Sequence, residues 1–178
     1  MLIDTNGTYI ACYLSYIMMM FNNNRIKFVI SIAICQYAGV IGSVFTALTV
    51  TTWYPSLTKP NLSPPGWIFA PVWITLYFLM GVSLYLIWTN NNVKNNSRKK
   101  ALVVFGIQLI LNVFWSLLFF GLKSPVYGLI DILFLLATIT LTIIFFYKIS
   151  VLAAILLIPY LVWVSFATLL NYNIVLLN

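Results

Sequence analysis

The chain consists of five long apolar runs separated by shorter polar or proline-rich breaks. The runs cover residues 26–50, 65–88, 101–121, 125–147 and 150–172. Each run is as long as the roughly 20 residues that an α-helix needs to cross the hydrocarbon core of a bilayer. The pattern therefore predicts an all-α integral membrane protein, in which residues 26–178 form a bundle of five transmembrane helices.

The breaks between the runs differ in character. Residues 89–100 are predicted to form a polar loop, and residues 122–124 and 148–149 tight turns. The first break, residues 51–64, is rich in proline, which stiffens the backbone. It contains Trp53 and is followed by Trp67 and Trp73, and these aromatic side chains have surface to bury. We interpret it as a structured lid over a cavity among the helices. The alternative interpretation is an aromatic belt at the membrane surface with a proline-rich turn.

Residues 1–25 precede the first apolar run, and we predict that they are a peripheral extension. Residues 9–21 are apolar but too short to span a bilayer, and no basic segment precedes them as it would in a signal peptide. An interfacial helix, a sixth partial span and a translation start at one of the methionines at positions 18–20 remain open. No function is assigned to this part.

The composition agrees with a membrane protein and removes most catalytic chemistry. Hydrophobic residues make up 63% of the chain and charged residues 6%. The acidic residues are Asp4 and Asp131, and there is no histidine. A Ser-His-Asp triad, a histidine-ligated metal and a catalytic carboxylate pair are therefore excluded, and we expect no metal and no cofactor.

The basic residues predict an orientation in the membrane. The net charge is +7, but the positive charges lie at predicted helix ends, so we expect no nucleic-acid partner. Seven of the nine basic residues fall on one side of the predicted membrane, and Lys59 and Lys123 fall on the other. The positive-inside rule then places the N-terminus in the cytoplasm and the lid outside. Asparagine-rich loops and the lack of a recognisable targeting segment favour a prokaryotic plasma membrane.

Polar and aromatic side chains recur at helical spacing within the apolar runs. The stripes are Trp73, Tyr77, Met80 and Leu84; Gln108, Asn112, Trp115 and Phe119; and Tyr160, Trp163, Ala167 and Asn171, the last after an expected kink at Pro159. With a rise of about 1.5 Å per residue, Asn112 falls near the middle of the membrane. Trp73, Trp115, Trp163 and Asp131 fall in its outer half. These depths predict an aromatic-walled pocket that opens outward under the lid.

Each polar group inside the bilayer has a structural interpretation beside the functional one, because such groups are unfavourable unless they are paired. Gln108 and Asn112 either join helices through hydrogen bonds or contact a ligand. Asp131 either pairs with Lys59 or Lys123 or contacts a ligand. The sequence leaves both alternatives open.

Five segments in a fixed order make the chain similar to a known family. They are WYPSLTKP, SPPGWIFAPVWITLYFLMG, QLILNVFWSLLFFG, the helix with Asp131, and IPYLVWVSFATLLNYNIVLLN. With these motifs the chain resembles the tryptophan-rich sensory protein and translocator protein family (TspO/MBR), also known as peripheral-type benzodiazepine receptors. The lid of that family often carries an aromatic residue where this chain has Leu62.

The resemblance implies a membrane receptor or sensor, commonly a homodimer, that binds porphyrins and other hydrophobic molecules. It implies a pocket under the first loop, formed by Tyr54, Pro64, Trp73, Asn112, Trp115, Trp163 and Ala167. Trp73 and Asn112 would supply polar contacts. Lys59 would meet a porphyrin carboxylate, and Asp131 is a second accessory residue.

Two other function classes are weighed against the receptor. Some members of the family promote light- and oxygen-dependent breakdown of protoporphyrin, and in such an enzyme Trp73 and Trp163 would be the catalytic candidates, as electron donors. A transporter of tetrapyrroles or membrane lipid is the other class. The chain shows no inverted repeat and no second acidic residue for ion coupling within the spans, which disfavours a transporter.

Overall fold

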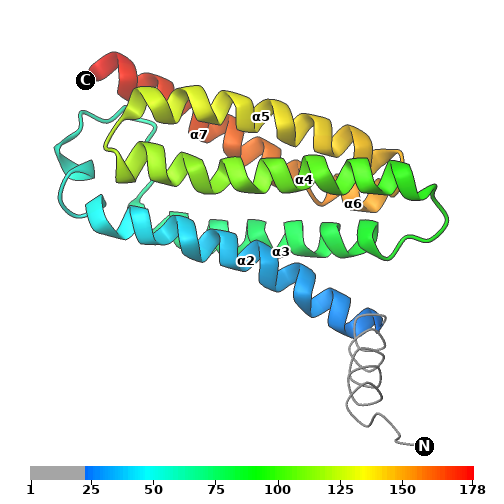
Figure 1. The fold of residues 1–178 in the computed structure, drawn as a ribbon. Helices are drawn as coiled ribbons and strands as arrows, with labels where there is room; N and C mark the ends of the chain where they lie inside the picture. The colour runs from blue at the N-terminus through cyan, green and yellow to red at the C-terminus, as the bar shows by residue number, and fades with distance from the viewer. Residues whose placement is uncertain (1–22) are drawn as a thin grey trace, which may run out of the picture.

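The computed structural model describes residues 23–178, and this part of the chain consists of helices joined by loops (Figure 1). The long helices are α2 (Asn24–Thr49), α3 (Phe69–Trp88), α4 (Asn95–Ser116), α5 (Pro125–Tyr147) and α7 (Ile158–Leu177), with a short α6 (Val151–Ile155) before the last. Two 3₁₀ turns, η1 (Tyr54–Ser56) and η2 (Gly66–Ile68), lie between α2 and α3, and a π-helical turn, η3 (Leu117–Gly121), extends α4. The predicted peripheral extension lies almost entirely outside the described residues.

Within residues 23–178, five helical segments are long and apolar enough to cross a membrane, which confirms the predicted fold class. Two of the predicted boundaries are wrong. The third span begins at Asn95 rather than at residue 101, and the last ends at Leu177 rather than at residue 172. The length of an apolar run reflects the thickness of the bilayer and not the length of the helix, so a helix continues past the run into segments with polar residues such as Arg98 and Asn173.

Local sequence signals set several helix starts. The side chain of Asn23 accepts a hydrogen bond from the backbone N–H of Arg25 at 3.0 Å and caps α2. Ser124 caps α5 by accepting from the N–H of Tyr127, and Pro125 occupies the first turn, where a missing N–H is harmless. The turn before α5 is tight, since Lys123 adopts a left-handed backbone conformation with φ of 54°.

The kink predicted at Pro159 is confirmed as a break between α6 and α7 at residues 156–157. Proline has no N–H to donate to the carbonyl of Ile155, so the helix cannot continue regularly through this point. The Ser83 hydroxyl donates to the carbonyl of Ala153 at 2.7 Å and ties the short α6 to α3.

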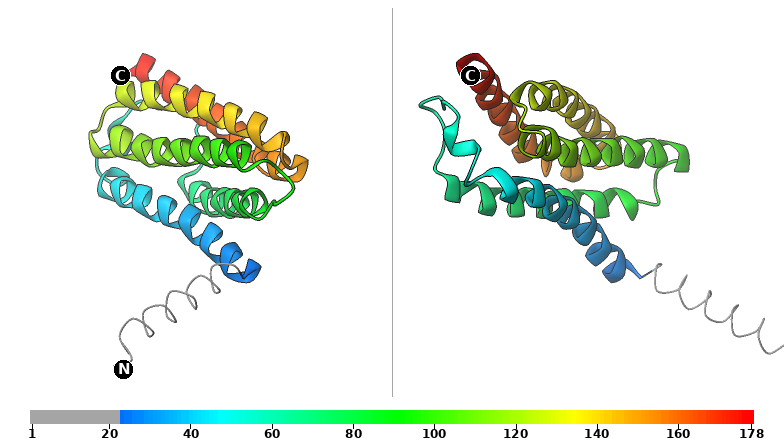
Figure 2. Two further views of the ribbon diagram at one scale, coloured as in Figure 1. Left: turned by 45° about the vertical axis from the view of Figure 1, so that its right-hand side comes forward. Right: turned by 60° about the vertical axis from the view of Figure 1, so that its left-hand side comes forward.

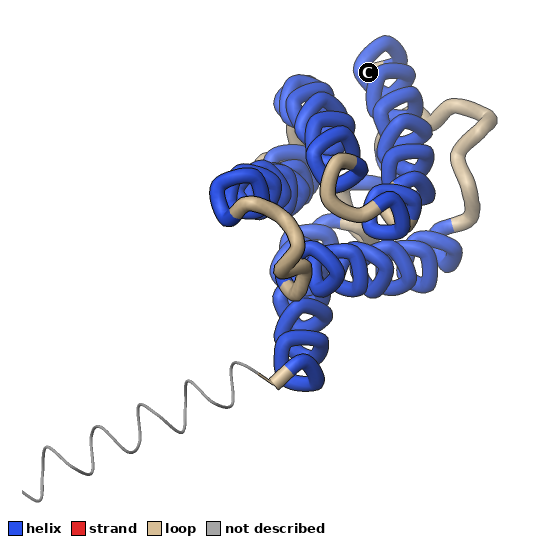
Figure 3. Tube along the Cα trace, turned by 90° about the vertical axis from the view of Figure 1, so that its right-hand side faces the viewer, coloured by secondary structure: helices blue, strands red, loops and turns tan. Residues whose placement is uncertain are grey.

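The helices form a bundle in which α2 packs along α3 and α4, α4 along α5, and α5 along α7. Helix α3 also meets α6, whereas it touches α7 only sparsely. The lid (residues 51–64), the α4–α5 turn and the end of α7 lie at one end of the bundle (Figures 1 and 2). Figure 3 views the bundle from the other end, with the α3–α4 and α5–α6 connections in front.

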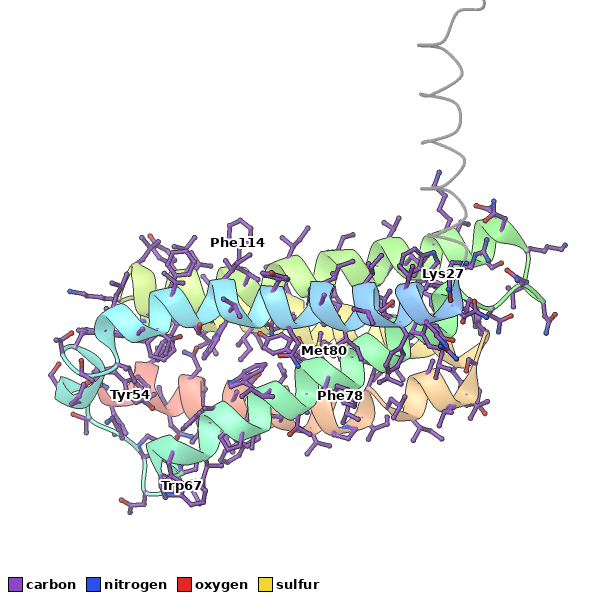
Figure 4. The ribbon with its side chains drawn as sticks, turned by 90° about the horizontal axis from the view of Figure 1, so that it is seen from below. Lys27, Tyr54, Trp67, Phe78, Met80 and Phe114 are labelled. Atoms are coloured by element: carbon purple, nitrogen blue, oxygen red, sulfur yellow. The ribbon has the colours of Figure 1, made fainter. Side chains whose placement is uncertain are left out.

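The core lies between the helices, and apolar side chains also cover the outside. Met80 is completely buried between α2 and α3, while Phe78 and Phe114 are exposed and point away from the bundle (Figure 4). Apolar groups on the outer surface suit a protein whose helices are surrounded by lipid. The backbones of α2 and α3 approach closely at Gly81, where a Cβ atom would lie 2.6 Å from the Cα of Ile32.

Candidate ligand-binding site

The lid is held against the helices by aromatic contacts. The ring of Tyr54 packs against Phe120 and Phe119 with centroids 5.6 and 6.3 Å apart, and Trp53 packs against Phe119 at 5.8 Å. Both phenylalanines are buried and come from the π-helical turn η3. The ammonium of Lys59 lies 4.3 Å from the centre of the Tyr54 ring. Burial raises the pKa of Tyr54, so its hydroxyl stays neutral and able to donate a hydrogen bond.

A buried hydrogen-bond network joins three helices deeper in the bundle. The Tyr77 hydroxyl of α3 donates to Oδ1 of Asn112 on α4, and Nδ2 of Asn112 donates to the Tyr160 hydroxyl of α7 at 3.0 Å. All three side chains are buried. The Asn112 amide thus has a protein partner on each of its polar atoms, which is the interhelical interpretation of this residue.

Replacing Asn112 with alanine is expected to lower the free energy of unfolding by about 1–2 kcal/mol, because two interhelical hydrogen bonds are lost and two buried hydroxyls lose a partner. Denaturant unfolding in detergent measures this change. The control is Asn173→Ala, since within residues 23–178 the Asn173 amide bonds only to the carbonyl of Leu169 in its own helix. A large loss of ligand affinity with unchanged stability would instead make Asn112 a direct ligand contact.

Two of the predicted tryptophans lie near this network. Trp73 stacks on Tyr77 with centroids 5.5 Å apart and meets the edge of Tyr160 at 6.4 Å. Trp163 packs edge-on against Phe69, at the lid end of α3, at 5.9 Å. Both indoles are half-buried. They flank the region where α3 touches α7 only sparsely.

The third predicted tryptophan, Trp115, belongs to a second group of contacts, which lies closer to the lid. Trp115 stacks on Phe119 at 5.3 Å, and its Nε1 donates to Oδ1 of Asn171 at 3.3 Å. Asn171 in turn donates from Nδ2 to the carbonyl of Pro125 at 2.7 Å. Because Phe119 also contacts Tyr54, this group of contacts connects the interior of the bundle with the lid.

Several buried polar atoms in the described part of the chain have no hydrogen-bond partner. They are Ser31 Oγ, Ser63 Oγ, both polar atoms of the Gln108 amide, Asp131 Oδ2 and Trp163 Nε1. Neither Lys59 nor Lys123 therefore bonds to Asp131 Oδ2, although Asp131 is only 7% exposed. Such atoms are unfavourable in an apolar interior unless a water molecule or a bound molecule in contact with them supplies the missing partner.

The remaining predicted residues lie around this region without direct bonds to the others. Pro64 is half-buried in the lid. Ala167 is half-buried one turn beyond Trp163 on α7 and packs against the core. The structure links the predicted site residues mainly through Tyr77, Phe119 and Tyr160, which the sequence placed in the stripes but not in the site.

Other residues of the site were not predicted as such. Asn171 was recognised only as part of a stripe, and Phe69 was not singled out. The helical spacing from Trp163 to Asn171 was the available signal for the first. No sequence signal pointed to Phe69, because its contact with Trp163 joins two different helices.

A separate apolar groove runs along the outer surface of α2 and α4. It has a volume of about 630 Å³ and is lined by residues such as Ile34, Tyr37, Ile41, Ile110 and Phe114. None of the predicted site residues lines it. The groove faces outward, where lipid chains surround the helices, and is distinct from the aromatic site under the lid.

Comparisons with known proteins cover most of the chain. The model of the TspO/MBR family matches residues 31–177. The tryptophan-rich protein TspO of Archaeoglobus fulgidus is 48% identical over 155 residues, which are 87% of this chain and 99% of the relative. The human translocator protein is 40% identical over 135 residues, which are 74% of this chain and 78% of the relative. The tryptophan-rich sensory protein of Cereibacter sphaeroides is 30% identical over 151 residues, or 85% of this chain and 90% of the relative.

The family match extends through all five apolar helices, so the protein is an integral membrane protein that crosses the bilayer several times. The aromatic stripes, the lid and the identity to relatives over 78% or more of their length lead to one conclusion. The chain belongs to the TspO/MBR family.

Proposed function

We propose that the protein is a membrane receptor or sensor that binds porphyrins and other hydrophobic molecules beneath the lid. The observation that carries this proposal is the indole N–H of Trp163, which is buried without an acceptor between aromatic side chains of α3 and α7. A flat macrocycle stacks well on tryptophan and tyrosine rings. A carboxylate or ring nitrogen of the ligand would accept the free hydrogen bond. Relatives named as a sensory protein and a translocator protein fit such a role.

The proposed contacts fall into two groups. The proposed ligand-binding residues are Tyr54, Pro64, Trp73, Asn112, Trp115, Trp163 and Ala167, among which Asn112 contributes by positioning Tyr77 and Tyr160 through its two interhelical hydrogen bonds. Lys59 is exposed on the lid and can turn from the Tyr54 ring toward a porphyrin propionate. Asp131 has an unpartnered buried oxygen and is an accessory residue. This oxygen would accept a hydrogen bond from a donor group of the ligand.

A second candidate function is light- and oxygen-dependent breakdown of protoporphyrin at the same site. The stacking of Trp73 on Tyr77 favours it, because two oxidisable rings then lie in contact beside the proposed ligand. The excited porphyrin and oxygen would supply the reactivity, and the protein would supply the site.

Titration of the purified protein with protoporphyrin IX, first in darkness and then in light, tests both functions. A receptor should show saturable quenching of tryptophan fluorescence in darkness and no new absorbing product in light. A light-dependent product that disappears when Trp73 and Trp163 are both replaced, at a porphyrin concentration that still saturates the variant, would establish the enzyme. The absence of saturable quenching would reject both proposals.

We also propose an orientation, a location and an oligomeric state. The N-terminus faces the cytoplasm of a prokaryotic cell, the lid faces outward from the plasma membrane, and two copies form a homodimer. The support for the orientation is the charge distribution. Lys59 and Lys123 belong to the lid and the α4–α5 turn at one end of the bundle, and the other seven basic residues belong to segments at the opposite end.

The orientation predicts the labelling of single cysteines by an impermeant thiol reagent in intact cells. In a chain without its native Cys12 and Cys35, a cysteine in place of Asn61 should react, because the lid faces outward. A cysteine in place of Asn92 should react only after the membrane is permeabilised. The reverse pattern would contradict the proposed orientation.

A further inference from the structure

A single side chain from the end of α7 holds the middle of the lid. The backbone N–H of Thr58 donates to Oδ1 of Asn178 at 2.9 Å, and Nδ2 of Asn178 donates back to the carbonyl of Thr58 at 3.1 Å. The two residues are 120 positions apart in the chain. A carboxamide that exchanges both hydrogen bonds with one residue imitates the pairing between neighbouring β-strands.

Asn178 is itself oriented by its own helix. Its Nδ2 also donates to the carbonyl of Ile174 at 2.9 Å. Ile174 is 3% exposed and packs in the cluster that contains Phe119 and Phe120, on which Tyr54 rests. The amide group of Asn178 is therefore fixed to a well-packed part of the bundle, next to the phenylalanines on which Tyr54 packs.

The remaining hydrogen bonds of the lid do not reach across the bundle. Among the described residues, lid side chains and backbone groups otherwise bond within the lid or to the flanking helix α2, as Ser63 N–H does to the carbonyl of Pro60 and Thr52 to the carbonyl of Leu48. The lid is thus attached to the rest of the bundle by apolar packing of Trp53, Tyr54 and Leu57 on the cluster of Phe119, Phe120 and Ile174, and by the amide of Asn178 at Thr58.

The Asn178 bonds are solvent-exposed, whereas the aromatic contacts of Phe119 and Phe120 are buried. Water competes for exposed hydrogen bonds, so each contributes only modestly and can break and form again without unfolding the bundle. The lid can therefore detach at Thr58 while the helices stay in place.

We infer that Asn178 is a latch that holds the lid over the aromatic site and thereby controls how fast a ligand enters and leaves. This inference rests on the proposed function, because it concerns access to the same site. If the closed lid blocks passage equally in the empty and the occupied protein, loss of the latch raises the association and dissociation rates by the same factor. The equilibrium affinity then stays nearly constant.

The test compares Asn178→Ala with the wild-type protein and with the control Asn173→Ala. Among the residues that the structure describes, the Asn173 amide bonds only within α7. Stopped-flow quenching by protoporphyrin IX in darkness gives both rate constants. Loss of the two bonds to Thr58 should raise both rates about tenfold and change the dissociation constant less than threefold. The control should leave the rates unchanged. Equal rates in the wild type and Asn178→Ala would overturn the latch, even if the melting temperature falls.

Hydrogen exchange of the lid in the absence of ligand provides a second measurement. The Thr58 amide should exchange several-fold faster in Asn178→Ala, whereas amides in the middle of α4 should not change. Unchanged exchange at Thr58 would show that Asn178 does not hold the lid. If the wild-type protein does not bind protoporphyrin IX, the proposed function and the control of ligand access both fail. Exchange at Thr58 then still decides whether Asn178 fixes the lid.

Discussion

Replacing Trp73 or Trp163 with alanine should weaken the binding of protoporphyrin IX by about 1–3 kcal/mol, or about fivefold to 150-fold, the scale of losing one aromatic stacking surface. Trp73 stacks on Tyr77 and faces Tyr160, and Trp163 packs against Phe69, so both rings belong to the walls between α3 and α7. The loss should be larger for a ligand with a hydrogen-bond acceptor in the Trp163 variant, because the free indole N–H disappears with the ring. Quenching titrations in darkness on folded detergent samples measure both effects.

Trp88→Ala is the matched control for these variants. Trp88 is a half-buried tryptophan on the same helix as Trp73, but it ends α3 at the opposite end of the bundle from the lid. Its replacement should leave porphyrin affinity unchanged. Equal losses at Trp88 and Trp73 would indicate general packing damage. Unchanged affinity in both site variants would place the ligand elsewhere and reject the proposed site.

Gly81→Ala should destabilise the protein by about 1–3 kcal/mol through overpacking. The added Cβ would lie 2.6 Å from the Cα and 3.1 Å from the backbone nitrogen of Ile32. Backbone atoms cannot rotate away as a flexible side chain does, so α2 and α3 must separate. Tyr77 lies one turn along α3 from Gly81, and the ring of Tyr77 lies against Gly39 of α2. The separation should therefore also loosen the Tyr77–Asn112 hydrogen bond and reduce ligand affinity.

Gly106→Ala makes the same chemical change at a helical position without a close neighbour, since no heavy atom would lie within 4 Å of its Cβ. This variant should be as stable as the wild type or more stable by up to about 1 kcal/mol, because alanine favours helix more than glycine does. Denaturant unfolding of the two variants side by side measures the difference. Similar stability of Gly81→Ala and Gly106→Ala would mean that α2 and α3 are free to move apart.

The individual helices could be predicted from the sequence, because the residues that determine each helix lie close together in the chain. Apolar length predicted five membrane spans, and these follow from the low polarity of the bilayer, which requires every backbone hydrogen bond to be made within a helix. Helical spacing correctly placed Gln108, Asn112 and Phe119 at buried positions of α4 and its extension η3. The start of α4 at Asn95 was not predicted. Residues 95–100 are polar, so the hydrophobic pattern does not distinguish this first part of the helix from a loop.

The candidate site was only partly predictable, because its contacts join residues that lie far apart in the chain. The spacing that put Asn112 on an inward face did not show that its amide partners are Tyr77 and Tyr160, which lie 35 and 48 residues away. The pairing of Asn178 with Thr58 joins even more distant residues.

By itself the sequence determined the number of spans, the inward stripes and the likeness to the TspO/MBR family, because each depends on residues near one another in the chain. The tertiary structure decided which stripes meet, where α2 and α3 touch at Gly81, and what holds the lid. Those contacts depend on how the helices are placed relative to one another, and side chains on different helices meet only when the whole bundle is packed.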